Sequence, residues 1–170
     1  MDGGKEQLII LKDITIISDS LNIDIWLKGG WAIDFLLKKI TREHSDIDIV
    51  TFVKNREKLE RELIQKDFIP VVVKEPFQNR QSIFLKEDVE VSFGYLDYNS
   101  DGDLIMHELP EWVWRKDSLT QEPVIFSNIS IKLIHPKQLL EEKLTYSKIG
   151  YPHRQKDEES KKLLRKIIEV

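Results

Sequence analysis

Two aspartates separated by a single residue are the first candidates for chemistry in this sequence. Asp46 and Asp48 alternate with the apolar residues Ile47 and Ile49. Successive side chains of a β-strand point to opposite faces, so the two carboxylates would share one face while the isoleucines enter the core. Carboxylates on a rigid strand suit Mg²⁺, which prefers oxygen ligands from one or two carboxylates and from substrate phosphates. Without further signals, however, an Asp-x-Asp pattern on a strand is more often simply solvated.

A glycine pair lies upstream of the aspartates. Gly29-Gly30 separates an apolar stretch, Ile23–Leu27, from a segment of helical period, Trp31–Lys39. This order predicts a strand, a turn and a helix. Glycine lets a phosphate approach the backbone, and the first N–H groups of a helix bind anions. With the two aspartates, the glycine turn predicts a site for a metal-bound triphosphate.

The extended sequence around these residues resembles a known enzyme family. Residues 28–34 read Lys-Gly-Gly-Trp-Ala-Ile-Asp, and residues 41–49 read Thr-Arg-Glu-His-Ser-Asp-Ile-Asp-Ile. Both runs resemble the antibiotic nucleotidyltransferases of the DNA polymerase β-like superfamily, in particular the lincosamide nucleotidyltransferases and the aminoglycoside 2″-adenylyltransferase. The resemblance is strong over residues 26–49, looser to about Gly102, and limited to a few positions beyond it.

The resemblance implies a reaction and its cofactor. An acceptor hydroxyl would attack the α-phosphorus of a nucleoside triphosphate, with ATP as the expected donor, and pyrophosphate would leave. The acceptor would be an aminoglycoside, a lincosamide or a similar small molecule. Two Mg²⁺ ions, or Mn²⁺ in their place, would be held by Asp46 and Asp48. Glu90, which is flanked by valines, is the expected third carboxylate, serving as metal ligand and general base, although the family more often has aspartate there.

The resemblance also assigns residues to ligand binding. The expected contacts to the nucleotide and its phosphates are Gly29, Gly30, Arg42, Lys143 and Arg154, with Lys156 as a further candidate. His44 and Asp34 are expected to contact the substrate. A histidine before a strand can equally stabilise its loop, and Asp34 can equally interact with the start of its own helix.

The elements that would position these residues alternate in type. Their order is helix, strand, helix, strand, helix, then mostly strands, and finally two helices over Lys137–Ile149 and Gln155–Ile168. This order indicates an α+β fold with a mixed β-sheet flanked by helices. We expect a nucleotidyltransferase domain over residues 1–135 and a C-terminal helical segment over residues 136–170 that packs on it. The aromatic stretch Glu111–Leu119 has no clear assignment.

Composition narrows the class of protein. The chain has 170 residues, of which 41% are hydrophobic and 33% charged, as in ordinary globular domains. It has no cysteine, which excludes thiolate and disulfide chemistry. A net charge of −4 argues against long nucleic acid as the main partner. With no apolar run long enough to span a membrane and no signal-peptide pattern, we expect a cytoplasmic protein without membrane contact.

Two alternatives stay open at this stage. An enzyme of the same fold could nucleotidylate a protein or RNA, although such members typically have a Gly-Ser turn where this chain has Gly29-Gly30. A non-catalytic nucleotide-binding module is the other alternative, because a shared fold does not guarantee activity, and Glu90 in place of aspartate is its best support. A homodimer that completes the acceptor pocket is compatible with either.

Overall fold

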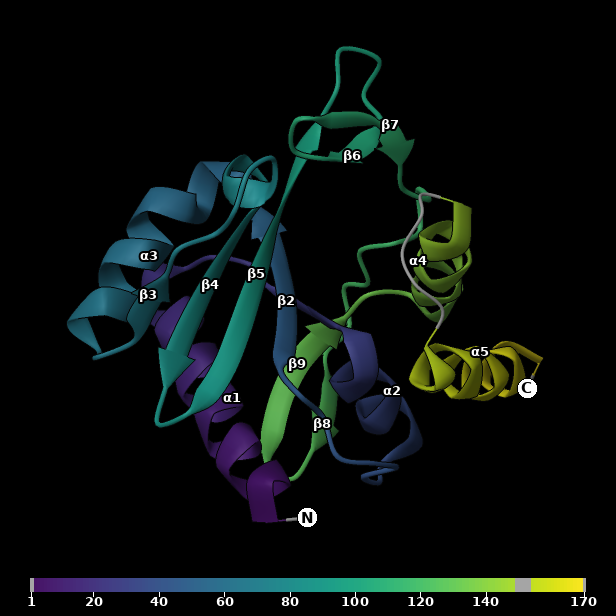
Figure 1. The fold of residues 1–170 in the computed structure, drawn as a ribbon, viewed down its shortest axis with the longest axis horizontal. Helices are drawn as coiled ribbons and strands as arrows, with labels where there is room; N and C mark the ends of the chain where they lie inside the picture. Colours follow the sequence, from purple (N-terminus) through teal and green to yellow (C-terminus); the bar gives the residue numbers. More distant parts are fainter. Residues whose placement is uncertain (1, 149–153, 170) are drawn as a thin grey trace.

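A computed structural model describes residues 2–148 and 154–169 (Figure 1). The helices are α1 (Asp2–Leu21), α2 (Gly29–Leu37), α3 (Arg56–Gln65), α4 (Pro136–Lys148) and α5 (Gln155–Glu169), with short 3-10 turns η1 (Val53–Asn55) and η2 (Phe77–Asn79). The strands are β1 (Trp26–Lys28), β2 (Ile47–Phe52), β3 (Ile69–Val71), β4 (Gln81–Lys86), β5 (Val89–Tyr98), β6 (Leu104–Met106), β7 (Leu109–Val113), β8 (Val124–Phe126) and β9 (Ile129–Leu133).

One mixed sheet forms the centre of the molecule. Its strands follow the order β3-β4-β5-β2-β1-β9-β8, and β6 and β7 extend it from the far end of β5. The β2–β5 and β1–β9 pairs are parallel, and the other pairs are antiparallel. This arrangement confirms the predicted α+β fold with a mixed sheet flanked by helices.

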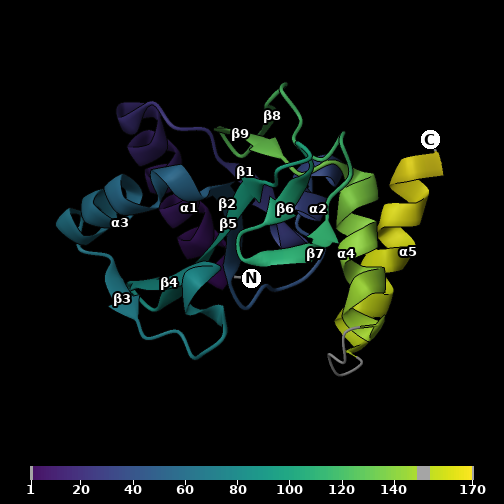
Figure 2. The ribbon, with the colours of Figure 1, turned by 90° about the horizontal axis from the view of Figure 1, so that it is seen from above.

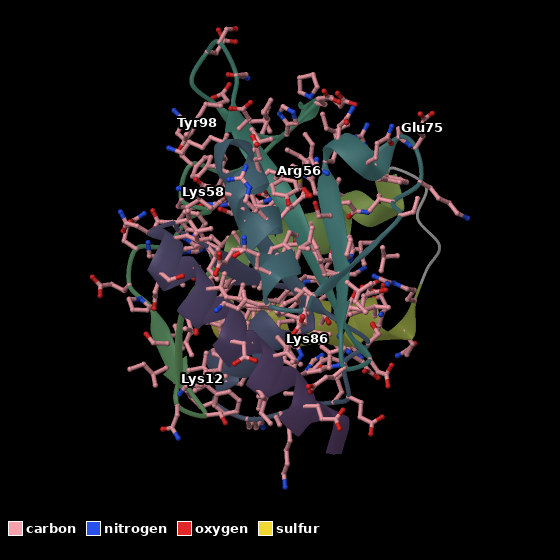
Figure 3. The ribbon with its side chains drawn as sticks, turned by 90° about the vertical axis from the view of Figure 1, so that its left-hand side faces the viewer. Lys12, Arg56, Lys58, Glu75, Lys86 and Tyr98 are labelled. Carbon is pink, nitrogen blue, oxygen red and sulfur yellow. The ribbon has the colours of Figure 1, made fainter. Side chains whose placement is uncertain are left out.

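Helices cover both faces of the sheet. Figure 2 shows α1 and α3 on one side and α2, α4 and α5 on the other. Figure 3 looks onto the first side, with Lys12 on α1 and Arg56 at the start of α3. The α1 helix buries one apolar stripe of residues three or four positions apart, namely Ile10, Leu11, Ile14 and Ile17. Of the helices described, none is both long and apolar enough to cross a membrane.

Two antiparallel hairpins are closed by tight turns. The β4–β5 turn contains Glu87 and Asp88 with φ of 49° and 66°, and the β8–β9 turn contains Ser127 and Asn128 with φ of 52° and 62°. Consecutive residues with positive φ match the right-handed twist of antiparallel strands, and they allow a tight connection. The β4–β5 hairpin matters for the site because it fixes Glu90 near the start of β5.

Element boundaries differ from the predictions in several places. Asp46 lies just before β2 instead of inside it, so only Asp48 is held by the strand ladder. The unassigned aromatic stretch begins within β7, which pairs with β6 through an irregular register. The first C-terminal helix begins at Pro136, and its predicted last residue, Ile149, lies outside the described residues. Pairing partners distant in sequence decide such boundaries, and local patterns do not contain them.

Candidate active site

A pocket of about 1010 Å³ lies between the sheet and the helices α4 and α5. The start of α2, the loop before β2, the pocket faces of β1, β2 and β5, and the β6–β7 hairpin contribute to its lining. Most of the predicted site residues line it: Gly29, Gly30, Arg42, His44, Asp46, Asp48, Lys143 and Arg154, together with Lys156. Glu90 and Asp34 are the predicted site residues outside the lining.

Asp48 occupies the centre of a row of polar side chains across the sheet. The strand register places Lys28 of β1 on one side of it and Ser92 of β5 on the other. Burial and the nearby charge of Asp46 raise the pKa of Asp48 to about 6, against a smaller opposing effect of Lys28. Asp46 and Asp48 are a suitable donor pair for a divalent cation, whose charge would stabilise the ionised form of Asp48.

Glu90 lies beside Asp46 but does not line the pocket. Since Ile47 pairs with Val91, Glu90 falls next to Asp46 at the edge of the site. Burial, the charge of Asp46 and a hydrogen bond between the two side chains raise the pKa of Glu90. Across residues 2–148 and 154–169, no three His, Cys, Asp or Glu side chains are grouped so that they could hold a metal ion. The residues therefore fit a two-carboxylate metal site, and a metal-binding role for Glu90 stays a prediction.

The glycine pair makes room for the groups around it. Gly29 has a φ of +71°, and a Cβ atom there would lie 2.6 Å from Oδ2 of Asp48. A Cβ atom on Gly30 would lie 2.5 Å from Nδ1 of His44 and 2.7 Å from Nη2 of Arg42. Any side chain at either position would displace a predicted site residue. The absence of side chains also leaves the backbone at the start of α2 open to a ligand.

Asp34 is fully buried and holds the loop that precedes β2. Its Oδ1 accepts a hydrogen bond from Oγ1 of Thr41 at 2.5 Å, and its Oδ2 lies 2.5 Å from Nε2 of His44. Gln7 of α1 donates to the backbone oxygen of His44 at 2.8 Å and accepts from the indole of Trp31 at 2.7 Å. The expected substrate contact by Asp34 is therefore corrected: with no exposed surface, this carboxylate supports the loop. His44 bonds Asp34 within the loop and also lines the pocket, so it can both support the loop and contact a substrate.

Lys143 and Arg154 both bind the carboxylate of Asp157, which was not among the predicted site residues. Asp157 of α5 accepts hydrogen bonds from Lys143 at 2.8 Å and from Arg154 at 2.7 and 3.0 Å. Burial raises the pKa of Asp157, but these hydrogen bonds outweigh burial and hold the pKa below its ordinary value. Arg154 lies directly before the helix predicted over Gln155–Ile168 and three residues ahead of Asp157, and this spacing was the available signal.

A second carboxylate joins α4 to the sheet. Glu142 is 3% exposed, and its Oε1 lies 3.1 Å from Nζ of Lys28 at the end of β1. Glu142 also adds to the negative charge near Asp48. Lys28 therefore links the strand next to the candidate metal ligands with the helix that carries Lys143. Lys28 belongs to the motif of residues 28–34 but was given no role, and Glu142 was not among the predicted site residues.

The pocket continues along β5 away from the two aspartates. Ser92 lies beside Asp48, whereas Leu96, which pairs with Met106, is four residues further along β5, or about 13 Å at the usual strand rise. The lining at this end includes the apolar and aromatic residues Phe77, Met106, Leu109 and Trp112, together with the charged residues Arg80 and Glu111. This region offers contact surface to the parts of a ligand that carry no phosphate.

Comparisons with known proteins find a matching enzyme family. Residues 10–164 match the model of the aminoglycoside-2″-adenylyltransferase family. A 2″-aminoglycoside nucleotidyltransferase of Klebsiella pneumoniae is 39% identical over 54 residues, and one of Escherichia coli has the same identity over the same length. These matches cover 32% of this chain and 30% of each relative, so the curated relatives are matched over less than a third of their own length.

Solved structures extend the similarity to nearly the whole fold. ANT(2″)-Ia in complex with adenylyl-2″-tobramycin superposes with a TM-score of 0.75 at 18% identity, covering 96% of this chain and 90% of that one. The lincosamide adenylyltransferase LnuA with lincomycin bound gives a TM-score of 0.71 at 24% identity, covering 95% of this chain and 96% of that one. At such identities the similarity concerns the fold, including the helices α4 and α5 that close the pocket.

Proposed function

Because the chain belongs to the aminoglycoside-2″-adenylyltransferase family, we propose that it transfers a nucleoside monophosphate from a nucleoside triphosphate to a hydroxyl of a small antibiotic. ATP is the expected donor. The proposal rests mainly on one observation: Asp46, Asp48 and the glycine residues at the start of α2 line the same pocket, which has a volume of about 1010 Å³. A pocket at the upper end of the usual range for ligand sites, up to roughly 1,000 Å³, suits a nucleotide and an acceptor together.

The residues divide the work of the reaction. The α2 backbone N–H groups and Arg42 would bind the phosphates, and Lys143 of α4 and Arg154, directly before α5, would approach them from the opposite side of the pocket. When bound by Asp46 and Asp48, Mg²⁺ or Mn²⁺ supplies the positive charge that stabilises the entering and leaving oxygens of the displacement. The bond from the acceptor oxygen to the α-phosphorus forms as the bond to the bridging oxygen of pyrophosphate breaks.

The proton of the attacking hydroxyl needs an acceptor. Glu90 is our candidate, because its carboxyl lies next to Asp46 at the edge of the site and burial raises its pKa. In this role it would take the proton as the new oxygen–phosphorus bond forms. A second copy of the chain as partner stays a prediction.

Pyrophosphate release tests the proposal. The assay would combine each of the four ribonucleoside triphosphates and Mg²⁺ with tobramycin or lincomycin, the compounds in the two similar structures. Acceptor-dependent release that is lost in Asp48→Asn is the expected result. Magnesium-dependent triphosphate binding without release on any acceptor would favour the non-catalytic binding module, an alternative supported by the position of Glu90 outside the pocket lining.

A further inference from the structure

The end of the pocket that lies away from the two aspartates is bounded by two segments. One is η2 with the residue that follows it, Arg80, and the other is the β6–β7 hairpin. The backbone oxygen of Arg80 accepts a hydrogen bond from the N–H group of Tyr95 at 2.9 Å, and Tyr95 lies three residues beyond Ser92 on β5, or about 10 Å at the usual strand rise. Asn79 of η2 donates to Glu108 in the hairpin turn at 2.9 Å, so the two segments are joined.

Apolar side chains from both segments make up much of the lining at this end. They are Phe77 on the first segment and Met106, Leu109 and Trp112 on the hairpin. The ring of Trp112 lies 6.0 Å from that of Trp114, which is only 2% exposed, so the apolar surface is supported by buried side chains. Such a surface binds the apolar parts of a ligand, whereas charged groups would lose hydration against it.

Of the residues that the structure describes, only Arg80 and Glu111 bring charge to this end of the lining. Nε of Arg80 is buried, and the described residues offer it no hydrogen-bond partner. Cζ of Arg80 lies 5.7 Å from the centre of the Phe77 ring, a contact that leaves its charge in place. Arginine stays protonated in proteins, so this end of the pocket has one fixed positive charge and one carboxylate, with no excess of negative charge.

The other carboxylates among the described lining residues have different roles. Asp46 and Asp48 are the candidate metal ligands, and Glu142 forms a buried ion pair with the last residue of β1. Residues 149–153, outside the described part of the chain, contain no aspartate or glutamate in the sequence. A polycation needs several carboxylates to offset its lost hydration, and this end of the pocket offers it Glu111 alone. A triphosphate would be repelled by Glu111, which therefore indicates a second ligand with a cationic group.

We propose that the acceptor is an amphipathic molecule with an apolar face and a single cationic group, and that Arg80 is a specificity-determining residue that excludes polycations. The apolar face packs on Trp112, the cationic group pairs with Glu111, and the guanidinium of Arg80 donates to a hydroxyl or carbonyl oxygen of the acceptor. Further ammonium groups are repelled by Arg80 and find no carboxylate of their own. The inference rests on the proposed function for the reaction and adds the class of acceptor, which differs from the aminoglycosides that the family's name specifies.

Acceptor affinity, measured without turnover, tests the class of acceptor. Calorimetry in the presence of Mg²⁺ and a non-hydrolysable ATP analogue would compare lincomycin, which has one amine, with tobramycin, which has several. The wild type should bind lincomycin about tenfold or more tightly than tobramycin, because only lincomycin matches both the apolar surface and the charges. The affinity for the ATP analogue would be measured separately for every variant.

Variants of Arg80 and Trp112 test the two parts of the inference. Arg80→Glu should weaken lincomycin and strengthen tobramycin, each by about tenfold, and Arg80→Gln should give smaller changes in the same directions and decides the question if Arg80→Glu does not fold. Trp112→Ala should weaken lincomycin by about tenfold or more and change tobramycin little. Arg80→Gln and Trp112→Ala should both leave the affinity for the ATP analogue unchanged. Arg61→Glu is the matched control, since Arg61 lies on α3 outside the pocket lining, and it should change no affinity.

The outcomes separate this inference from the proposed function. Tighter binding of tobramycin than of lincomycin by the wild type, or no binding of lincomycin, would overturn the inference. Loss of affinity for the ATP analogue instead of lincomycin in Trp112→Ala would also overturn it, because this end of the pocket would then hold the nucleotide base. Lincomycin binding that depends on Arg80 and Trp112, but without pyrophosphate release from ATP, would support the acceptor preference and refute the proposed transfer alone.

Discussion

Replacing Gly29 by alanine tests whether the glycine turn sets the position of Asp48. With a φ of +71°, Gly29 adopts a left-handed conformation that costs other residues about 1–2 kcal/mol. In a chain of this length, each kcal/mol lowers the unfolding temperature by about 2–4 °C, so the backbone effect alone predicts a loss of about 2–8 °C. The new Cβ atom would also lie 2.6 Å from Oδ2 of Asp48, which must then move.

Gly102 provides a control with the same backbone effect and no collision. Its φ is +81°, and a Cβ atom there would have no neighbour within 4 Å. Gly102→Ala should therefore lose a similar unfolding temperature and keep its activity. Gly29→Ala should in addition lose about 10–100-fold in activity or magnesium affinity, the usual effect of displacing the support of a metal ligand.

The assay for both variants combines thermal unfolding with pyrophosphate release measured over a range of Mg²⁺ concentrations. A shift of the Mg²⁺ dependence to higher concentrations in Gly29→Ala alone is the expected result. If Gly29→Ala and Gly102→Ala lost the same unfolding temperature and both kept wild-type Mg²⁺ dependence, the contact between the turn and Asp48 would have no functional meaning.

Three further perturbations address the charges of the site. Asp48→Asn removes a repelled carboxylate, so the metal-free protein should unfold at the same or a higher temperature while its stabilisation by Mg²⁺ disappears; a marked drop without metal would refute this. Lys28→Met leaves the buried Glu142 without its ion-pair partner and should lower the free energy of unfolding, measured with denaturant, by about 3–5 kcal/mol. The control Lys132→Met breaks the more exposed pair of Lys132 with Asp24 and should lower it by about 0–1 kcal/mol. The pKa of Asp157 is lowered in the folded state, so the stability that its ionised carboxylate contributes is present above the ordinary pKa of 3.8 and is lost as pH falls through the lowered pKa. Asp157→Asn should therefore be less stable than wild type at pH 7 but lose less stability than wild type below about pH 4. Parallel pH profiles of the two proteins in thermal unfolding would contradict this.

Local patterns were sufficient to predict the parts of the site that lie close together in sequence. Asp48 could be placed because alternation along a strand fixes the face of each side chain, and the burial of Ile47 and Ile49 confirms that alternation. The glycine turn of Gly29 and Gly30 could be placed because a strand and a helix with different periods meet there. These residues depend on short segments whose geometry follows from their own sequence.

The supporting residues depend on contacts that no local pattern contains. Asp34 lies on a predicted helix, but its burial follows from the return of the loop that carries Thr41 and His44. Glu90 was expected as the third carboxylate of the site, and only the parallel pairing of β2 with β5 places it beside Asp46 instead of in the pocket lining. Asp157 acquires its role when α5 packs against α4 and receives Lys143. Tertiary packing thus decides which of the charged residues become part of the site.

The most direct test of the account is to follow transfer of the nucleotide to the acceptor itself. Mass spectrometry would examine tobramycin and lincomycin after incubation with the protein, ATP and Mg²⁺, alongside Asp48→Asn as the control. The account predicts that at least one acceptor gains the mass of an adenylyl group, in step with pyrophosphate release, and that Asp48→Asn yields neither product. An equal gain of mass with Asp48→Asn would contradict the assignment of the metal site. No gain on either acceptor, with ATP bound in the presence of Mg²⁺, would contradict the proposed transfer to these antibiotics.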